Sequence, residues 1–339
     1  MVRPLTVVLV PGLQELTDAY FRAPRLNHAR RMYSVAQLKR GLRAPSLFLR
    51  ELNYLYHTRL KTRDHNTAGV DLMTQDWDYL CLLDACRYDM FEDQSTLPGT
   101  LESRQSRGSN TVEFLQANLA GRELHDTVYV TANPQYRRHF DELDAEFHAV
   151  IDVWQDSGWN EVYNTVLPET TTEYALEAAR EYPNKRLLVH YMQPHYPFID
   201  DETDFDKRHL HNEMDDTIDF WHEIMFGQLA LTPSDIWPLY RKTLAAALPH
   251  VEEFITTLEG KHVVTADHGN MVGERASPVP VTEWGHPRGI YTEELVKVPW
   301  QVYQWGDRPE ITSEEPIDQA TGVEDDTTMD RLRDLGYVQ

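Results

Sequence analysis

The chain has 339 residues, enough for one large α/β domain or two smaller domains with an ample core. Its net charge of −23 argues against a nucleic-acid partner, because a phosphate backbone requires a basic surface. Only seven of the 32 basic residues are lysines, and such an acidic, lysine-poor surface is typical of halophilic proteins from an acidic proteome.

The sequence contains no apolar run that approaches the ~20 residues of a membrane span. The apolar stretch of residues 5–13 follows a basic residue, but Pro11 interrupts it and no small-residue cleavage site follows, which argues against a signal peptide. The two cysteines, Cys81 and Cys86, lie five residues apart and suggest no disulfide framework. We therefore expect a cytoplasmic protein. The basic residues 1–66 also allow a peripheral contact with a membrane.

Residues 1–66 form a basic N-terminal segment. It contains 12 Lys/Arg and 4 Asp/Glu, a net charge of +8, whereas the rest of the chain has 20 and 51, a net charge of −31. Within it, leucines at loosely helical spacing are surrounded by basic residues: Leu47, Leu49, Leu52, Leu55 and Leu60, with Arg50, Arg59 and Lys61. Such a helix either meets an anionic membrane or a partner, or packs on the acidic face of its own domain, and we favour the second interpretation.

Apolar runs and helical repeats alternate through the middle of the chain. We predict strands at 77–83, 127–131, 186–192, 262–266 and 296–303. We predict helices that begin near residue 111 and that span 170–182 and 236–258. This alternation indicates an α/β fold with a mostly parallel central sheet and helices on both faces.

These patterns divide the chain into three parts: the basic segment 1–66, an α/β domain over 67–309, and an acidic linker with a C-terminal segment over 310–339. Residues 200–236 are acidic and contain histidines but show no sheet pattern, so we expect an insertion near the functional site. The basic segment precedes the first predicted strand and supplies no residue to the motifs below. We therefore expect it to be dispensable for chemistry on a small soluble substrate.

Ligand-type residues follow the predicted strands. Asp84 ends the first strand, Asp267 and His268 end the fourth, and His195 lies just beyond the third. His286 lies in the loop before the last strand. In open α/β sheets, ligands bind beyond the carboxyl ends of the strands. Two carboxylates and imidazoles that meet there suit a divalent metal, Zn²⁺ or Mn²⁺ before Ca²⁺ because of the nitrogen donors.

A hydroxyl group at a predicted helix N-terminus completes the set. Ser109 and Thr111 lie where a capping pattern opens the helix after the first strand. Backbone N–H groups and the helix dipole favour an anion at such a position. A hydroxyl beside a metal and an anion-binding helix end is suited to phosphoryl or sulfuryl transfer. We favour Thr111, because the uninterrupted helical pattern begins after it, whereas Ser109 follows the flexible Gly108.

At these motifs the chain resembles the alkaline phosphatase superfamily, and within it the sulfatase-like branch. The resemblance covers roughly residues 75–339, with the motifs in the order of the family. The matching stretches are D-A-C-R-Y-D at 84–89, H-Y-P-F at 195–198, T-A-D-H-G at 265–269 followed by G-E at 273–274, G-H at 285–286, the strand E-L-V-K-V-P at 294–299, and the tail R-L-R-D-L-G-Y-V at 331–338.

The resemblance implies a fold and a set of roles. It implies an alkaline-phosphatase-like sheet, with Asp84, Asp267 and His268 as ligands of a divalent metal (Zn, Mn or Ca). By the same resemblance, His195 and His286 hold a second metal or the anionic group of the substrate. Arg87 either contacts the substrate anion or only pairs with Asp89.

One departure from the family bears on the substrate. Formylglycine sulfatases carry a C-x-P-S-R or S-x-P-S-R run, and neither Cys81 nor Cys86 lies in such a run. The plain hydroxyl at Thr111 or Ser109 resembles instead the nucleophile of the family's phosphatases and phosphoglycol-lipid transferases. We therefore expect a metal-dependent hydrolase or transferase of phosphate or sulfate esters, with a small-molecule, glycan-linked or lipid-linked substrate.

Three other interpretations stay open. A sulfatase-like scaffold without activity could serve a membrane or glycan-processing assembly through the basic segment. A phosphosugar mutase would need further Asp and His ligands in an order that this sequence does not show. A thiol nucleophile at Cys86 is the third, although a cysteine at a strand tip is more often a small buried residue. We assign His190, in the middle of a predicted strand, to the core.

Overall fold

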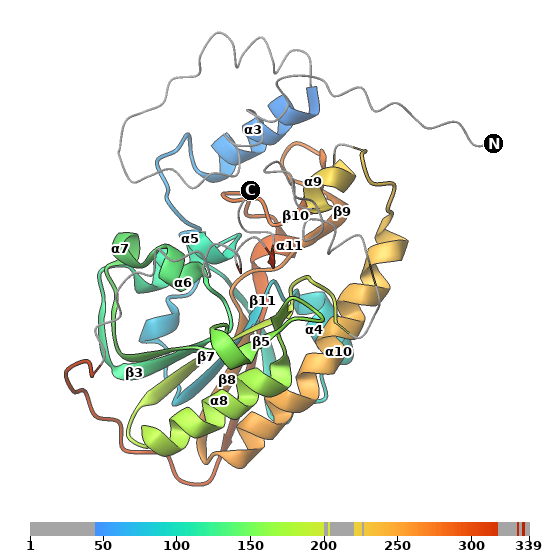
Figure 1. Cartoon of the computed structure of the whole chain (residues 1–339). Coiled ribbons are helices and arrows are strands. Elements are labelled where there is room, and N and C mark those ends of the chain that lie inside the picture. Colours follow the sequence, from blue (N-terminus) through green and yellow to red (C-terminus); the bar gives the residue numbers. More distant parts are fainter. Residues whose placement is uncertain are drawn as a thin grey trace.

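The computed structural model describes residues 45–199, 203, 220–225, 227–317, 331, 334 and 335. Its centre is a seven-stranded sheet with the strand order β2-β11-β8-β1-β7-β3-β4 (Figure 1). The strands are β1 (Tyr79–Asp84), β2 (Thr100–Gln105), β3 (Glu123–Thr131), β4 (Glu146–Asp152), β7 (Arg186–Pro194), β8 (Gly260–Ala266) and β11 (Lys297–Trp305). Only β11 runs against the others, so the predicted mostly parallel sheet is confirmed.

Helices cover both faces of this sheet, as predicted. One face packs against α4 (Tyr88–Gln94), α8 (Pro168–Glu181) and α10 (Pro233–Thr257). The other packs against α5 (Thr111–Leu119), α6 (Gln135–Arg138) and α7 (Phe140–Leu143). Strand β1 supplies side chains to both cores in alternation, Cys81 and Leu83 to the first and Leu80 and Leu82 to the second, as the pleat of a fully buried strand requires.

Two pairs of short strands lie outside the main sheet. β9 (Met271–Arg275) and β10 (Thr282–Gly285) form an antiparallel hairpin directly after β8, and β5 (Trp159–Asn160) pairs with β6 (Thr165–Val166). Helix α9 (Phe220–Met225) contacts β10. The hairpin continues the chain from the end of β8 to the loop that carries His286.

The five predicted strands are all present, but β2, β4 and the hairpin were not predicted. β2 is an edge strand whose residues, TLESRQ, are almost all exposed, so it lacks the apolar pattern on which the prediction depended. In β4 the sequence EFHAVID places a histidine among the apolar residues and mixes its buried and half-buried positions. Edge strands need only backbone pairing on one side, which leaves their composition weakly constrained.

Part of the basic segment forms helix α3 (Pro45–His57), while residues 1–44 lie outside the described residues. The leucines at 52 and 60 do not form its packed face, because both side chains are exposed. Arg50 and Asn53 are buried instead. The helix contacts the domain through Arg50, Asn53 and the half-buried Tyr54, so it packs on its own domain while its outer face stays exposed.

The insertion and the C-terminal segment are only partly described. Within 200–236, the described residues are 203, α9 and the stretch from Gly227 into α10, which already begins at Pro233. Beyond Ile317 only residues 331, 334 and 335 are described. A search of the described helices finds none that is both long and apolar enough to cross a membrane.

Candidate active site

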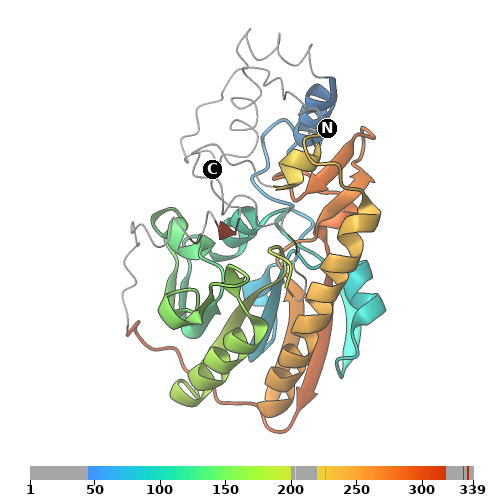
Figure 2. The same ribbon diagram turned by 45° about the vertical axis from the view of Figure 1, so that its right-hand side comes forward.

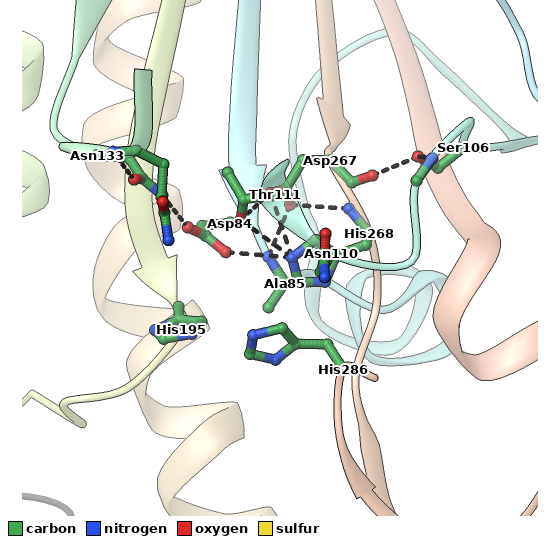
Figure 3. A network of polar contacts seen from close by, with 12 residues as sticks. Asp84, Ala85, Ser106, Asn110, Thr111, Asn133, His195, Asp267, His268 and His286 are labelled. Carbon is green, nitrogen blue, oxygen red and sulfur yellow. Dashed lines mark hydrogen bonds and ion pairs between the residues drawn. The ribbon is translucent and has the colours of Figure 1, made fainter. Parts of the chain in front are cut away.

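The candidate site lies at the carboxyl edge of β8, β1 and β7, three neighbouring parallel strands. Asp84 is the last residue of β1, and Asp267 directly follows β8, whose Ala266 pairs with Leu83. Both aspartates are fully buried. Parallel strands end at one edge of a sheet, so this register brings the two carboxylates together, as Figure 3 shows.

Hydrogen bonds fix each carboxylate. Asp267 Oδ1 accepts the N–H groups of Ala85 at 2.9 Å and His268 at 2.8 Å. Asp84 Oδ2 accepts the side-chain amide of Asn133 at 2.7 Å. Ala85 has a φ of 58°, an uncommon left-handed conformation for a residue with a Cβ, and this turn aims its N–H at Asp267. The backbone carbonyl of Asp267 also accepts the hydroxyl of Ser106.

His268 presents one ring nitrogen to these carboxylates. Its Nδ1 lies 2.7 Å from the carbonyl oxygen of Gly269, which can only accept, so Nδ1 carries the proton. Nε2 then keeps its lone pair, and it lies 3.3 Å from Asp267 Oδ2 and 3.7 Å from Asp84 Oδ1. A ring nitrogen fixed in this tautomer by a backbone carbonyl is the usual arrangement of a metal-binding histidine.

The hydroxyl of Thr111 belongs to the same cluster. Thr111 is the first residue of α5, and Asn110 caps the helix by accepting the N–H of Glu113 at 2.9 Å. The Thr111 hydroxyl donates to Asp267 Oδ2 at 2.8 Å and lies 3.2 Å from His268 Nε2. As first-turn residues of a helix, Thr111 and Val112 have N–H groups without an intrahelical acceptor, which favours an anion there.

The hydroxyl of Ser109 points elsewhere. It donates to Glu113 Oε2 at 2.9 Å or the carbonyl of Pro287 at 3.0 Å, and it accepts the N–H of Gly289 at 2.8 Å. These contacts tie the start of α5 to the loop that follows His286. The structure therefore brings Thr111, and not Ser109, to the carboxylates.

His190 joins the group, although the sequence analysis assigned it only to the core. Its partner in β1 is Leu82, so it lies on the same sheet face as Asp84 two residues further along. One ligand atom from each of Asp84, His190 and Asp267 lies within 4.8 Å of the other two. Within the described part of the chain, His190 Nε2 is buried without a hydrogen-bond partner, and Nδ1 lies 2.8 Å from the hydroxyl of Tyr129.

These residues fit a divalent metal ion. Burial, only partly opposed by Asp267, lowers the pKa of His190 to about 4, so its imidazole is neutral and able to coordinate. Burying two carboxylates this close together is costly, and a divalent ion between them would offset that cost. The donor set of two carboxylates, the nitrogens of His190 and His268 and the Thr111 hydroxyl suits Zn²⁺ or Mn²⁺.

Two further histidines lie together on one side of this cluster (Figure 3). His286 stacks on His268 with ring centroids 4.8 Å apart, and the His195 ring lies edge-on to it at 5.2 Å. His195 Nδ1 lies 2.5 Å from the carbonyl oxygen of Tyr196, which leaves Nε2 as the unprotonated nitrogen. Burial, with the nearby histidines His268, His195 and His222, lowers the pKa of His286 well below its usual value.

A small hollow with almost no free volume lies beside His195. Its lining is mostly apolar and aromatic: Ala85, Pro194, His195, Tyr196, Phe198, Trp221, Tyr240 and Asn270. The hollow adjoins the turn after β1 through Ala85.

Arg87 and Cys86 lie close to the cluster but have other contacts. Both Nε and Nη2 of Arg87 donate to Asp89, at 2.9 and 2.6 Å, and Nη1 donates to Glu274 at 2.5 Å. Its guanidinium therefore ties α4 to the hairpin through Asp89 and Glu274. The thiol of Cys86 is fully buried, and burial raises its pKa well above the usual range, which disfavours the thiolate that a nucleophile requires.

No family model matches the sequence, and no curated protein matches it. Similar solved structures include the C-terminal periplasmic domain of a phosphoethanolamine transferase from Campylobacter jejuni, with 14% identity and a TM-score of 0.41 over 66% of this chain and 78% of that one. The soluble domain of lipooligosaccharide phosphoethanolamine transferase A from Neisseria meningitidis has 11% identity and a TM-score of 0.42, over 66% of this chain and 75% of that one. A Vibrio parahaemolyticus protein has 12% identity and a TM-score of 0.39, over 78% of this chain and 71% of that one. That last protein is described as a member of the alkaline phosphatase superfamily, the group that the motifs at 84–89 and 265–269 resemble.

Proposed function

We propose that the protein is a metal-dependent hydrolase or transferase of phosphate or sulfate esters, with Thr111 as the nucleophile. The observation that carries this proposal is the placement of the Thr111 hydroxyl, 2.8 Å from Asp267 Oδ2 and 3.2 Å from His268 Nε2, in a buried group of carboxylates and imidazoles. A scaffold protein has no need to bury two carboxylates beside a hydroxyl, because the cost of burial is then uncompensated. The geometry therefore favours an enzyme over the scaffold alternative.

The chain's own residues suit a two-step displacement. The Thr111 oxygen attacks phosphorus or sulfur as its proton passes to Asp267 Oδ2, and the bond to the leaving group breaks with its electron pair on the alkoxide oxygen, which takes a proton from solvent. In the second step, Asp267 returns the proton to the Thr111 oxygen. His195 Nε2, unprotonated in its tautomer, can then accept a proton from the water or alcohol that takes the group from Thr111. A divalent ion held by Asp84, Asp267, His268 and His190 would stabilise the negative charge that develops on the ester.

The choice between phosphate and sulfate is tested by a substrate screen. We expect p-nitrophenyl phosphate or bis(p-nitrophenyl) phosphate to turn over faster than p-nitrophenyl sulfate, because the chain has no formylglycine run. We expect turnover to need added Zn²⁺ or Mn²⁺ and to disappear with a chelator. Glycerol as a competing acceptor separates transfer from hydrolysis, since transfer produces glycerol phosphate. Tight metal binding near Asp267 without turnover of any ester would favour a scaffold.

The outer face of α3 supports a lipid-linked substrate and a peripheral membrane contact. Phe48, Leu52 and Tyr56 recur at helical spacing and are 49%, 38% and 49% exposed, and Leu60 beyond the helix is 74% exposed. They account for four of the six large apolar side chains exposed in the described part of the chain. Exposed basic residues follow at Arg59, Lys61 and Arg63. We propose a cytoplasmic protein whose basic segment meets an anionic lipid surface.

Replacing part of this apolar stripe should weaken the membrane contact. We expect Leu52→Ser/Tyr56→Ser to lower binding to phosphatidylglycerol vesicles by about tenfold or more, because burying two large side chains contributes about 2 kcal/mol. Vesicle cosedimentation measures this, with neutral phosphatidylcholine vesicles in parallel. Val162→Ser is the matched control, since Val162 is 76% exposed outside the stripe. Equal binding of all three proteins would remove the proposal, and loss of a dimer in the double variant would point to self-association instead.

A further inference from the structure

Helix α3 lies away from the main sheet, beside α9 and the β9–β10 hairpin (Figures 1 and 2). Its domain-facing side chains contact the chain on both sides of His286. Arg50 contacts Glu283, three residues before His286, and Tyr54 packs on Gly289, three residues after it. A helix outside the sheet thus holds both ends of the loop that carries one of the candidate substrate-binding histidines.

The contact with Glu283 is a buried ion pair. Arg50 Nε donates to Glu283 Oε1 at 2.7 Å, and Nη2 donates to the carbonyl of Thr282 at 2.7 Å. The two side chains are 6% and 0% exposed. Burial raises the pKa of Glu283 to about 7, although Arg50 acts to lower it. Removing Arg50 would leave a carboxyl group buried in strand β10 without its ionic partner.

Further contacts extend this attachment along the hairpin. The side chain of Asn53 donates to the carbonyl of Val279 and accepts its N–H, both at 2.8 Å, as a neighbouring strand would. His57 Nε2 lies 2.7 Å from the carbonyl of Ser277. At Gly289, whose φ is +73°, an added Cβ would lie 2.5 Å from the Tyr54 ring. Only glycine at this position therefore lets the loop approach the helix this closely.

Outside α3, the near strand of the hairpin is held by Arg87, which donates to Glu274, and by contacts of β9 with α10. β10 pairs only with β9, and the pair is separate from the seven-stranded sheet, so the sheet does not fix the position of its far strand. His286 follows β10 directly and has to reach the rings of His268 and His195. Its position therefore depends on α9 and α3, which pack against β10, and on the contacts of Ser109 with Pro287 and Gly289 in the loop after it.

We propose that α3 is a positioning element of the active site, and that Arg50, through Glu283, sets the place of His286 against His195 and His268. This inference rests on the proposed function in assigning His286 to the substrate. It also revises the expectation that the basic segment is dispensable for chemistry, since truncation at Ala68 would remove Arg50, Asn53 and Tyr54 together.

The test is Arg50→Met in the full chain, which keeps the length of the side chain and removes its charge and donors. We expect kcat/KM on the best ester of the screen to fall by about 100-fold, as for a binding group displaced by ~1 Å, with metal affinity unchanged. We also expect the ring signals of His286 to shift in the ¹⁵N spectrum of histidine-labelled protein, where His286→Asn identifies them. A role in stability alone would leave those signals in place.

Two further variants keep the result interpretable. Arg50→Met/Glu283→Gln avoids the unpaired carboxylate, so it should fold where the single variant does not, and it should still show the displaced His286 signals. Arg180→Met makes the same change at an exposed position of α8 and should match the wild type. Unchanged kcat/KM and unchanged His286 signals in a folded Arg50 variant overturn the inference. If the wild type turns over no ester, the proposed function fails, and the spectrum still decides the position of His286.

Discussion

Thr111→Ala is expected to reduce turnover at least about a thousandfold, a loss of about 4 kcal/mol in transition-state stabilisation. The hydroxyl that donates to Asp267 Oδ2 is the only nucleophilic group that the described residues place in the buried carboxylate cluster. Its removal leaves both carboxylates and His268 in place. We therefore expect metal affinity, measured by calorimetry, to change by less than about tenfold, and stability to fall by only about 1 kcal/mol for the lost hydrogen bond.

Three variants serve as controls for this result. Thr111→Ser keeps the hydroxyl and should retain much of the activity. Ser109→Ala removes contacts to Glu113 and Gly289, so it should cost stability and much less turnover. Cys86→Ala should be close to wild type, because its thiol is buried and its pKa is raised. If Ser109→Ala is inactive while Thr111→Ala is active, the nucleophile is Ser109. If both are active and Cys86→Ala is inactive, the hydroxyl mechanism is wrong.

The position of the two carboxylates could be predicted from the sequence because it depends on local patterns. Each apolar run ends in an aspartate, and parallel strands end at one edge of the sheet. The helix start at Thr111 could be predicted for the same reason, since the Asn110–Glu113 capping pattern is local. These features require only the identity and spacing of neighbouring residues. The packing of the elements against one another depends also on strand register and on contacts between residues far apart in the sequence.

The role of His190 depends on register, which the sequence does not state. Only the pairing of His190 with Leu82 places its ring on the face of Asp84, and an offset of one residue would turn it to the opposite core. If β1 and β7 are known to be parallel neighbours, the position of His190 opposite Leu82, two residues before Asp84, is the signal that would have identified it. Helix α3 was misread for another reason. Its packed face includes the polar Arg50 and Asn53, which hydrophobic periodicity does not identify, and two of the predicted leucines, Leu52 and Leu60, are exposed.

Asp267→Asn is expected to lower the affinity for Zn²⁺ or Mn²⁺ by more than the ~100-fold typical of a residue that only supports a ligand. Asparagine has nearly the same shape, and its Oδ1 can still accept the N–H groups of Ala85 and His268. The substitution removes the negative charge and places an N–H group toward the Thr111 hydroxyl. Turnover should fall by about a thousandfold or more, since metal and proton acceptor are lost together. His190→Gln should weaken metal binding less than Asp267→Asn does.

The stability of the metal-free protein should change in the opposite direction. Asp84 and Asp267 are both fully buried, and their ligand oxygens lie within 4.8 Å of each other and of His190, so the metal-free state contains two carboxylates that repel each other. Asp267→Asn relieves this repulsion and should raise the Tm measured in chelator, while abolishing the rise that Zn²⁺ produces in the wild type. Asp152→Asn is the control, because the Asp152 side chain is only 6% exposed but pairs with Arg137 at 2.6 Å. Breaking that pair should lower the Tm with and without metal. An Asp267→Asn protein that is less stable in chelator, and still stabilised by Zn²⁺, would show that the cluster is structural and that the ion binds elsewhere.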